Sequence, residues 1–174
     1  MSDSILVVCG QRGLGEQLIG LISAAIPGKH LLVTSGAEAR RKIGSSEYKA
    51  VLIAGKLPDE TILELAESLA VGGSSGIMIM VERDVLYDAH ESLDGTGVTI
   101  LVKPLTKDAL IHSIMLIVKV KEGGGTLEKA KLMLIQYKNF TEPQAHRYIQ
   151  KLAMDKRLPR EVAAQMIIKA FEKS

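Results

Sequence analysis

The chain lacks the features of secreted, membrane-spanning and disulfide-stapled proteins. Among its 174 residues there is one cysteine, Cys9, so no intramolecular disulfide can form, which suits a reducing cytoplasm. Residues 1–4 carry no basic segment of a signal peptide, and no apolar run approaches the ~20 residues that span a bilayer. We therefore predict a soluble, cytoplasmic protein with no membrane partner.

Aromatic residues are scarce as well, at 3%, and tryptophan is missing. The apolar fraction of 47% nevertheless suffices for a real core, which must be built from Ile, Leu, Val, Ala and Met. Wholesale disorder is thereby excluded. The length allows one ordinary domain and a small second one.

Residue groups that carry catalysis or bind metals are also missing. Four histidines are scattered, in no metal-ligand spacing with Cys9 or with carboxylates: His30, His90, His112 and His146. Cys9 lies in an apolar run and is predicted to be a packing thiol. The G-x-x-G-x-G spacing at residues 10–15 matches neither a dinucleotide fingerprint nor a P-loop, so we attribute these glycines to a tight turn. We predict no enzyme activity, metal or cofactor.

Short apolar runs alternate with helical patterns through the first two thirds of the chain. Five runs are typical of buried parallel strands, at residues 5–9, 30–34, 51–54, 77–81 and 98–102. Helical spacing follows each of them, at residues 14–25, 37–43, 62–69, 85–93 and 106–121. Because parallel strands need crossover connections, the pattern predicts an α/β fold with a five-stranded, doubly wound parallel sheet.

The helix expected at residues 106–121 is apolar over most of its circumference, whereas a surface helix shows one apolar stripe. One face must cover the sheet. The other face packs either on a second copy of the chain, giving a homodimer, or on the C-terminal helices of the same chain.

The three glycines at residues 123–125 mark the clearest boundary, dividing the chain into domains at residues 1–122 and 123–174. Three helical patterns follow and predict a small all-α domain. The second begins with a Thr cap at Thr141, an early proline and Gln144 at the third helical position. The expected buried stripes are Leu127, Ala130, Leu134 and Tyr137; Ala145, Tyr148, Ile149, Leu152 and Ala153; and Val162, Ala163, Met166, Ile167 and Ala170.

Charge is distributed unevenly between the two parts. Through Gly125 there are 12 basic and 15 acidic side chains, and from Thr126 onward 10 basic and 5 acidic. A basic small domain behind an acidic one fits a polyanion-binding module, although a solvated helical surface gives the same count.

Two proline motifs stand at strand ends: Lys103-Pro104 after the fifth apolar run and Leu57-Pro58 after the third. Together with the order of elements, they resemble the receiver domain of two-component response regulators over roughly residues 4–121. The resemblance implies a flavodoxin-like, receiver-type fold, a lysine at 103 that contacts a phosphoryl group, and a cis bond before Pro104.

The reactive positions of that family do not match. Its acidic pair falls at Cys9 and Gly10, its phosphate-accepting Asp at Ala54, and its Ser or Thr at Val81. Neither residues 6–10 nor residues 51–57 contain any Asp or Glu, and phosphoryl transfer needs a carboxylate nucleophile with an acidic Mg²⁺ site. We therefore interpret Cys9, Gly10, Ala54, Val81 and Lys103 as a degenerate phosphorylation site. A small ligand, or a sensor or regulatory protein, would then replace phosphate as the signal.

The C-terminal residues resemble the ANTAR antitermination domain from about residue 127 to 168. The resemblance is carried by Ala130-Lys131, by residues 141–145 (TEPQA), by residues 152–157 (LAMDKR) and by Glu161-Val162-Ala163. It departs from the family at Leu158-Pro159, before the third helix. It implies binding to paired hairpins in leader transcripts.

Seven side chains are the candidates for RNA contact: Lys131, Gln144, Arg147, Lys151, Lys156, Arg157 and Arg160. On the expected second helix they lie opposite the apolar stripe, and the arginines suit phosphate contact or stacking on a splayed base. Tyr148 falls on the apolar stripe and is predicted to be core.

Two other functions compete with RNA binding. One is a protein-interaction adaptor. The other is a helix-turn-helix DNA-binding regulator, for which no helix carries a run of base-reading polar residues.

Overall fold

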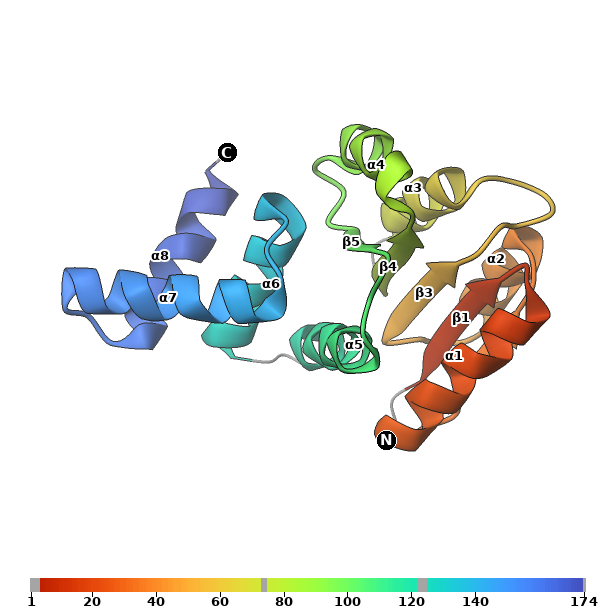
Figure 1. Ribbon diagram of the computed structural model, residues 1–174, viewed down its shortest axis with the longest axis horizontal. Coiled ribbons are helices and arrows are strands. Elements are labelled where there is room, and N and C mark those ends of the chain that lie inside the picture. The colour runs from red at the N-terminus through yellow and green to blue at the C-terminus, as the bar shows by residue number, and fades with distance from the viewer. Residues whose placement is uncertain (1–3, 73–74, 122–124, 174) are drawn as a thin grey trace. The chain divides into compact units, whose positions relative to one another are not determined.

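The computed structural model describes residues 4–72, 75–121 and 125–173 (Figure 1). The chain divides into two compact units, Met1–Val118 and Lys119–Ser174. Of the three glycines proposed as a boundary, Gly123 and Gly124 lie outside the described residues, and Gly125 caps the first helix of the second unit. The two units are described separately below.

The first unit contains one five-stranded sheet in which every pairing is parallel. Its strands are β1 (Ile5–Cys9), β2 (Leu31–Val33), β3 (Ala50–Ala54), β4 (Gly76–Val81) and β5 (Thr99–Val102). The spatial order is β2-β1-β3-β4-β5. The predicted α/β fold with a doubly wound parallel sheet is therefore confirmed, and each strand lies within about two residues of its expected range.

Helices connect the strands and follow the last one. They are α1 (Arg12–Ala25), α2 (Gly36–Ser45), α3 (Ile62–Gly72), the short 3₁₀ turn η1 (Arg83–Val85), α4 (Leu86–Leu93) and α5 (Lys107–Lys121). The region around residue 85, where the sequence shows only a weak helical pattern, is this 3₁₀ turn running directly into α4.

The sheet is buried on both faces because helices cover both. One face packs its alternate side chains, such as Leu6 and Val51, into a single core cluster with Ala39 of α2, Leu65 of α3 and Leu93 of α4. Such burial on two sides explains why the strands are continuous apolar runs rather than alternating ones.

The opposite face carries α1 and α5, and two glycines make this close packing possible. A Cβ atom at Gly15 of α1 would lie 2.6 Å from a methyl group of Leu32 in β2. A Cβ atom at Gly76 of β4 would lie 2.2 Å from a methyl group of Ile117 in α5. A larger residue at either position would require the Leu32 or the Ile117 side chain to shift. On the remaining surface of α5, Met115 is 40% exposed.

The second unit consists of three helices, α6 (Thr126–Lys138), α7 (Glu142–Lys156) and α8 (Arg160–Glu172), and each packs on the other two. The predicted small all-α domain is thus observed. The helix start at Thr141 is a complete capping box: the Thr141 hydroxyl accepts from the Gln144 N–H, and the Gln144 side chain accepts from the Thr141 N–H. Among the described residues, no helix is long and apolar enough to cross a membrane.

The predicted buried stripes of this unit are wrong at five of their members. Tyr148 is 46% exposed, and Tyr137, Val162, Met166 and Ala170 are exposed as well. The interior is built instead on small residues and short aliphatic stretches: Ala130, Leu132, Leu134, Ile135, Ala145, Ile149, Ala153, Ala163, Ala164 and Ile167. Alanines let the three helices approach closely, and Leu and Ile side chains fill the interior between them.

Candidate nucleic-acid interface and degenerate phosphorylation site

The exposed face of α7 carries two of the predicted RNA-contacting cations. Arg147 and Lys151 are four residues apart and Gln144 stands three residues before Arg147, so all three lie on one side of the helix. All three are exposed, whereas Ala145, Ile149 and Ala153 on the opposite side are buried. The helix therefore presents a polar face to solvent, as its sequence predicts.

Three more cations gather where α7 ends and α8 begins. Lys156 is the last residue of α7, Arg157 caps it, and Arg160 is the first residue of α8; all are exposed. Arg157 has left-handed backbone angles, with φ 55° and ψ 46°, and the chain turns there because the N–H of Leu158 donates to the Ala153 carbonyl at 2.9 Å. This tight turn holds three basic side chains within five residues.

Ion pairing separates these cations from Lys129 and Lys131 of α6. Lys131 pairs with Glu142 at 3.3 Å and its side chain is only 20% exposed, and Lys129 pairs with Glu172 at 3.8 Å. By contrast, within the described part of the chain no ion pair is formed by Arg147, Lys151, Lys156, Arg157 or Arg160. Five predicted cations thus have no acidic partner among the described residues, whereas Lys131 links α6 to α7 through its pair with Glu142.

Gln144 also has a structural role, since its Oε1 accepts the Thr141 N–H at 2.8 Å.

Sequence reasoning missed Tyr148, which lies next to Arg147 and three residues before Lys151 on the exposed side. Its ring meets Phe140 edge-on, with ring centroids 5.5 Å apart. The three-residue spacing from Tyr148 to Lys151 could have placed this ring on the exposed side. The apolar periodicity of the helix predicted instead that Tyr148 is buried.

The five residues of the degenerate phosphorylation site meet at the carboxyl end of the sheet. Cys9 and Ala54 are register partners in β1 and β3, and both are fully buried. Val81 is also buried, and its carbonyl accepts the Lys103 N–H at 2.9 Å. The Lys103–Pro104 peptide is cis, as the resemblance implies.

The space at the ends of β1 and β3 is filled by the chain itself. A Cβ atom at Gly10 would lie 1.9 Å from the Lys56 carbonyl oxygen. The Cys9 thiol donates to the Gln11 carbonyl at 3.2 Å, and Gly55, at φ +71°, stands between that thiol and the Gln11 side chain. A Mg²⁺ ion of the kind that receivers hold needs carboxylate oxygens here. Cys9, Gly10 and Ala54 offer none, so these residues do not fit the ion.

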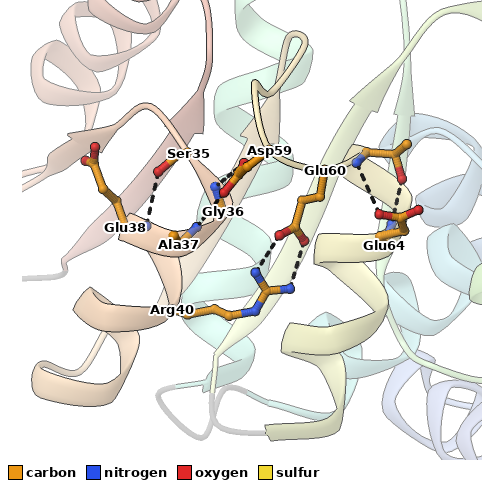
Figure 2. A network of polar contacts seen from close by, with 9 residues as sticks. Ser35, Gly36, Ala37, Glu38, Arg40, Asp59, Glu60 and Glu64 are labelled. Atoms are coloured by element: carbon orange, nitrogen blue, oxygen red, sulfur yellow. Dashed lines mark hydrogen bonds and ion pairs between the residues drawn. The ribbon is translucent and has the colours of Figure 1, made fainter.

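The loop after β3 is fastened to the start of α2 by acidic side chains (Figure 2). The Asp59 carboxylate accepts the N–H groups of Gly36 and Ala37, both at 3.0 Å, and these two bonds lower the pKa of Asp59 below its ordinary value. Glu60 forms a two-pronged ion pair with Arg40, whose pKa it raises. No local pattern predicts this link because the partners lie about twenty residues apart.

Comparison with known proteins defines both units. Residues 122–168 match the family model of the ANTAR domain. The receiver domain of an HD domain-containing protein from Pseudomonas fluorescens Pf-5 superposes with TM-score 0.63 at 18% identity, covering 70% of this chain and 90% of that one. A response regulator receiver domain from Clostridium thermocellum gives 0.62 at 18% identity, over 69% and 97%. A structure described as adenylate cyclase from Rhodopirellula baltica gives 0.63 at 19%, over 79% and 99%.

No curated protein matches the chain. These matches assign residues 122–168 to the ANTAR domain and give the first unit a receiver-type fold.

Proposed function

We propose that this protein binds paired hairpins in leader transcripts and thereby prevents a terminator hairpin from forming. The proposed contact surface is the exposed face of α7 together with the α7–α8 turn. The single observation that supports it best is the group of five exposed cations without an acidic partner among the described residues: Arg147, Lys151, Lys156, Arg157 and Arg160. Unpaired cations lose no internal ion pair when they bind phosphates.

The test is a salt-series titration of the full chain against a two-hairpin RNA, a scrambled single-stranded RNA and a DNA duplex, followed by fluorescence anisotropy. We expect the two-hairpin RNA to bind best, and the variant Arg147→Ala plus Arg157→Ala to lose that preference. A matched control, Arg41→Ala plus Lys42→Ala, removes the same charge from exposed positions of α2 and should retain the preference. Equal, weak and steeply salt-dependent binding to all three nucleic acids would contradict the proposal.

A protein-interaction adaptor remains the second candidate, because the same unit exposes apolar side chains. Met154 on α7 is 72% exposed, and Val162 and Met166 on α8 are 39% and 38% exposed. If these helices dock a protein, Arg147 and Arg157 are dispensable, Met154→Ser removes function, and added salt has little effect. The same double-arginine variant therefore distinguishes the two candidates.

For the receiver-type unit we propose a role without phosphorylation: dimerisation through α5 or reception of another signal. The lack of carboxylates at Cys9, Gly10 and Ala54 supports a role without phosphorylation. The 40% exposure of Met115 on the largely apolar helix α5 supports dimerisation through that helix. Two RNA-binding units held together would bind two hairpins at a high effective concentration.

Sedimentation velocity of the full chain at micromolar concentration tests the dimer, which we expect Met115→Glu to weaken. A strictly monomeric wild type would contradict the proposed dimer.

Such a regulator acts on nascent transcripts, without catalysis of its own, and its proposed location is therefore the cytoplasm. A sensor or regulatory protein remains a possible partner under this proposal.

A further inference from the structure

A pocket of about 830 Å³ opens at the carboxyl end of the sheet, beside the degenerate phosphorylation site. It lies between the loop after β3, the start of α3, the end of β4 and Lys103. Ligand pockets for small organic molecules span about 300–1,000 Å³. The pocket is therefore large enough for a small molecule and much larger than a phosphoryl group needs.

The wall of this pocket is mainly apolar. It is formed by Leu57, Ile62 and Leu63 on one side and by Met80, Val81 and Val85 on the other. Val81 stands where a phosphorylatable receiver has a hydroxyl, so this substitution turns a polar position into part of an apolar wall. An apolar group of a ligand gains free energy by leaving water for such a surface.

The loop that forms one side of the pocket is held in place from outside. Asp59 and Glu60 bind residues of α2, as Figure 2 shows. Leu57, which lies in the same loop between β3 and Asp59, is only 6% exposed. The pocket is thus preformed, and a ligand has little ordering cost to overcome on binding.

The pocket carries a cation, Lys103, that a ligand carboxylate can reach. Three carboxylates line it, but Glu60 is engaged by Arg40 and Glu82 by Lys103, while Glu64 accepts the Thr61 N–H in the first turn of α3. The Lys103 side chain is 30% exposed, whereas its partner Glu82, 3.5 Å away, is 66% exposed. Lys56 forms no ion pair among the residues that the structure describes. Outside the two ion pairs, the charges of Lys56 and Glu64 balance. Lys103, the less exposed member of its pair, is therefore the cation that can exchange Glu82 for a ligand carboxylate inside the pocket.

We propose that this pocket binds an amphipathic organic monoanion, whose apolar body lies on Leu63, Met80 and Val85 and whose carboxylate pairs with Lys103. A dianion such as a phosphate ester is disfavoured because three glutamates stand nearby. A cation is disfavoured because it would meet Lys103 and Lys56, while two of the three carboxylates, Glu60 and Glu82, already pair with other side chains. This site belongs to the receiver-type unit and its proposal does not rest on RNA binding, so either can fail without the other.

Three probes with the same ten-carbon chain test the charge: decanoate, decanol and decyltrimethylammonium, each titrated into the full chain below its micelle-forming concentration by isothermal titration calorimetry. We expect decanoate to bind most tightly and decyltrimethylammonium least. Lys103→Met should weaken decanoate about tenfold and leave decanol unchanged. Lys107→Met, an exposed lysine of α5 outside the pocket, should change decanoate affinity less than about twofold.

Filling the pocket tests its location. Val85→Trp and, independently, Leu63→Trp should abolish decanoate binding while the thermal unfolding transition of each variant is retained; two positions are used because one substitution can fail to fold. The proposal is overturned if decanoate does not bind the wild type, if the three probes bind equally, or if decanoate binds both folded tryptophan variants as it binds the wild type.

Discussion

The α-carbon of Gly10 lies so close to the Lys56 carbonyl oxygen that a Cβ atom on residue 10 would be 1.9 Å from that oxygen. The loop after β1 and the loop after β3 are therefore in backbone contact. In a phosphorylatable receiver the position of Gly10 bears an acidic side chain. Here no side chain of any kind fits unless one of the two loops moves.

Gly10→Ala should destabilise the receiver-type unit by about 1–3 kcal/mol, the usual cost of forcing extra atoms into a packed site. Gly20→Ala is the matched control: Gly20 lies within α1, where a Cβ atom would meet nothing within 4 Å. That substitution should stabilise the unit by about 0.5–1 kcal/mol because alanine is the better helix former. Urea unfolding measures both, and equal effects of the two substitutions would show that the close contact has no energetic consequence.

Incubation of the full chain with acetyl phosphate and Mg²⁺ should leave its intact mass unchanged. Ala54→Asp restores the missing nucleophile, yet we expect this variant to remain unmodified too, since Cys9 and Gly10 provide no carboxylate for the metal. Mass spectrometry makes the measurement. A gain of one phosphoryl group by the wild type would contradict the proposed role without phosphorylation.

The bonds from Gly36 and Ala37 to Asp59 make stability depend on pH in the acid range. They lower the pKa of Asp59 in the folded state below its value in the unfolded chain. The stabilisation is therefore complete above the unfolded pKa, and it is lost as pH falls through the folded pKa, below about pH 4.

Urea midpoints of the wild type should exceed those of Asp59→Asn near neutral pH, and the two should converge in acid. Asp94→Asn, at an exposed position after α4, serves as the control and should follow the wild type throughout. A constant difference between the wild type and Asp59→Asn from neutral pH into acid would contradict the assigned role of this carboxylate.

Salt dependence distinguishes the paired lysine from the unpaired arginine. Arg147→Ala should reduce the slope of log affinity for RNA against log salt by about 1, the loss of one phosphate contact. Lys131→Ala should leave the slope unchanged, because Lys131 already pairs with Glu142. Anisotropy titrations at several salt concentrations give both slopes, and equal losses would place Lys131 on the RNA-contacting surface.

Much of the fold was predictable because its signals are local. The strand at Ile5–Cys9 is fully buried, and burial on two faces requires an uninterrupted apolar run. The start of α7 was predictable since a capping box needs only Thr141 and Gln144 at the right spacing. The cis peptide before Pro104 was implied by the resemblance to receiver domains that Lys103-Pro104 carries.

The remaining features depend on contacts between distant segments. The ion pair of Lys131 arises from the way α6 packs on α7, and the link from Asp59 to α2 joins two loops. The 46% exposure of Tyr148 depends on how α7 packs on the other two helices, which the periodicity of one helix does not reveal. For the candidate surface, the sequence supplied the cations, and packing decided which of them are free of acidic partners among the described residues.

The left-handed backbone of Arg157 sets stability against charge at one residue. For a side-chain-bearing residue, this conformation costs about 1–2 kcal/mol, whereas glycine adopts it without penalty. A more stable turn was thus available by replacing the arginine with glycine, at the expense of a guanidinium in the middle of the basic group. If the proposed RNA contact is correct, the chain gives up some stability at the end of α7 to keep a side chain that binds phosphate. Selection for thermal stability alone would favour glycine at residue 157 and would thereby weaken RNA binding.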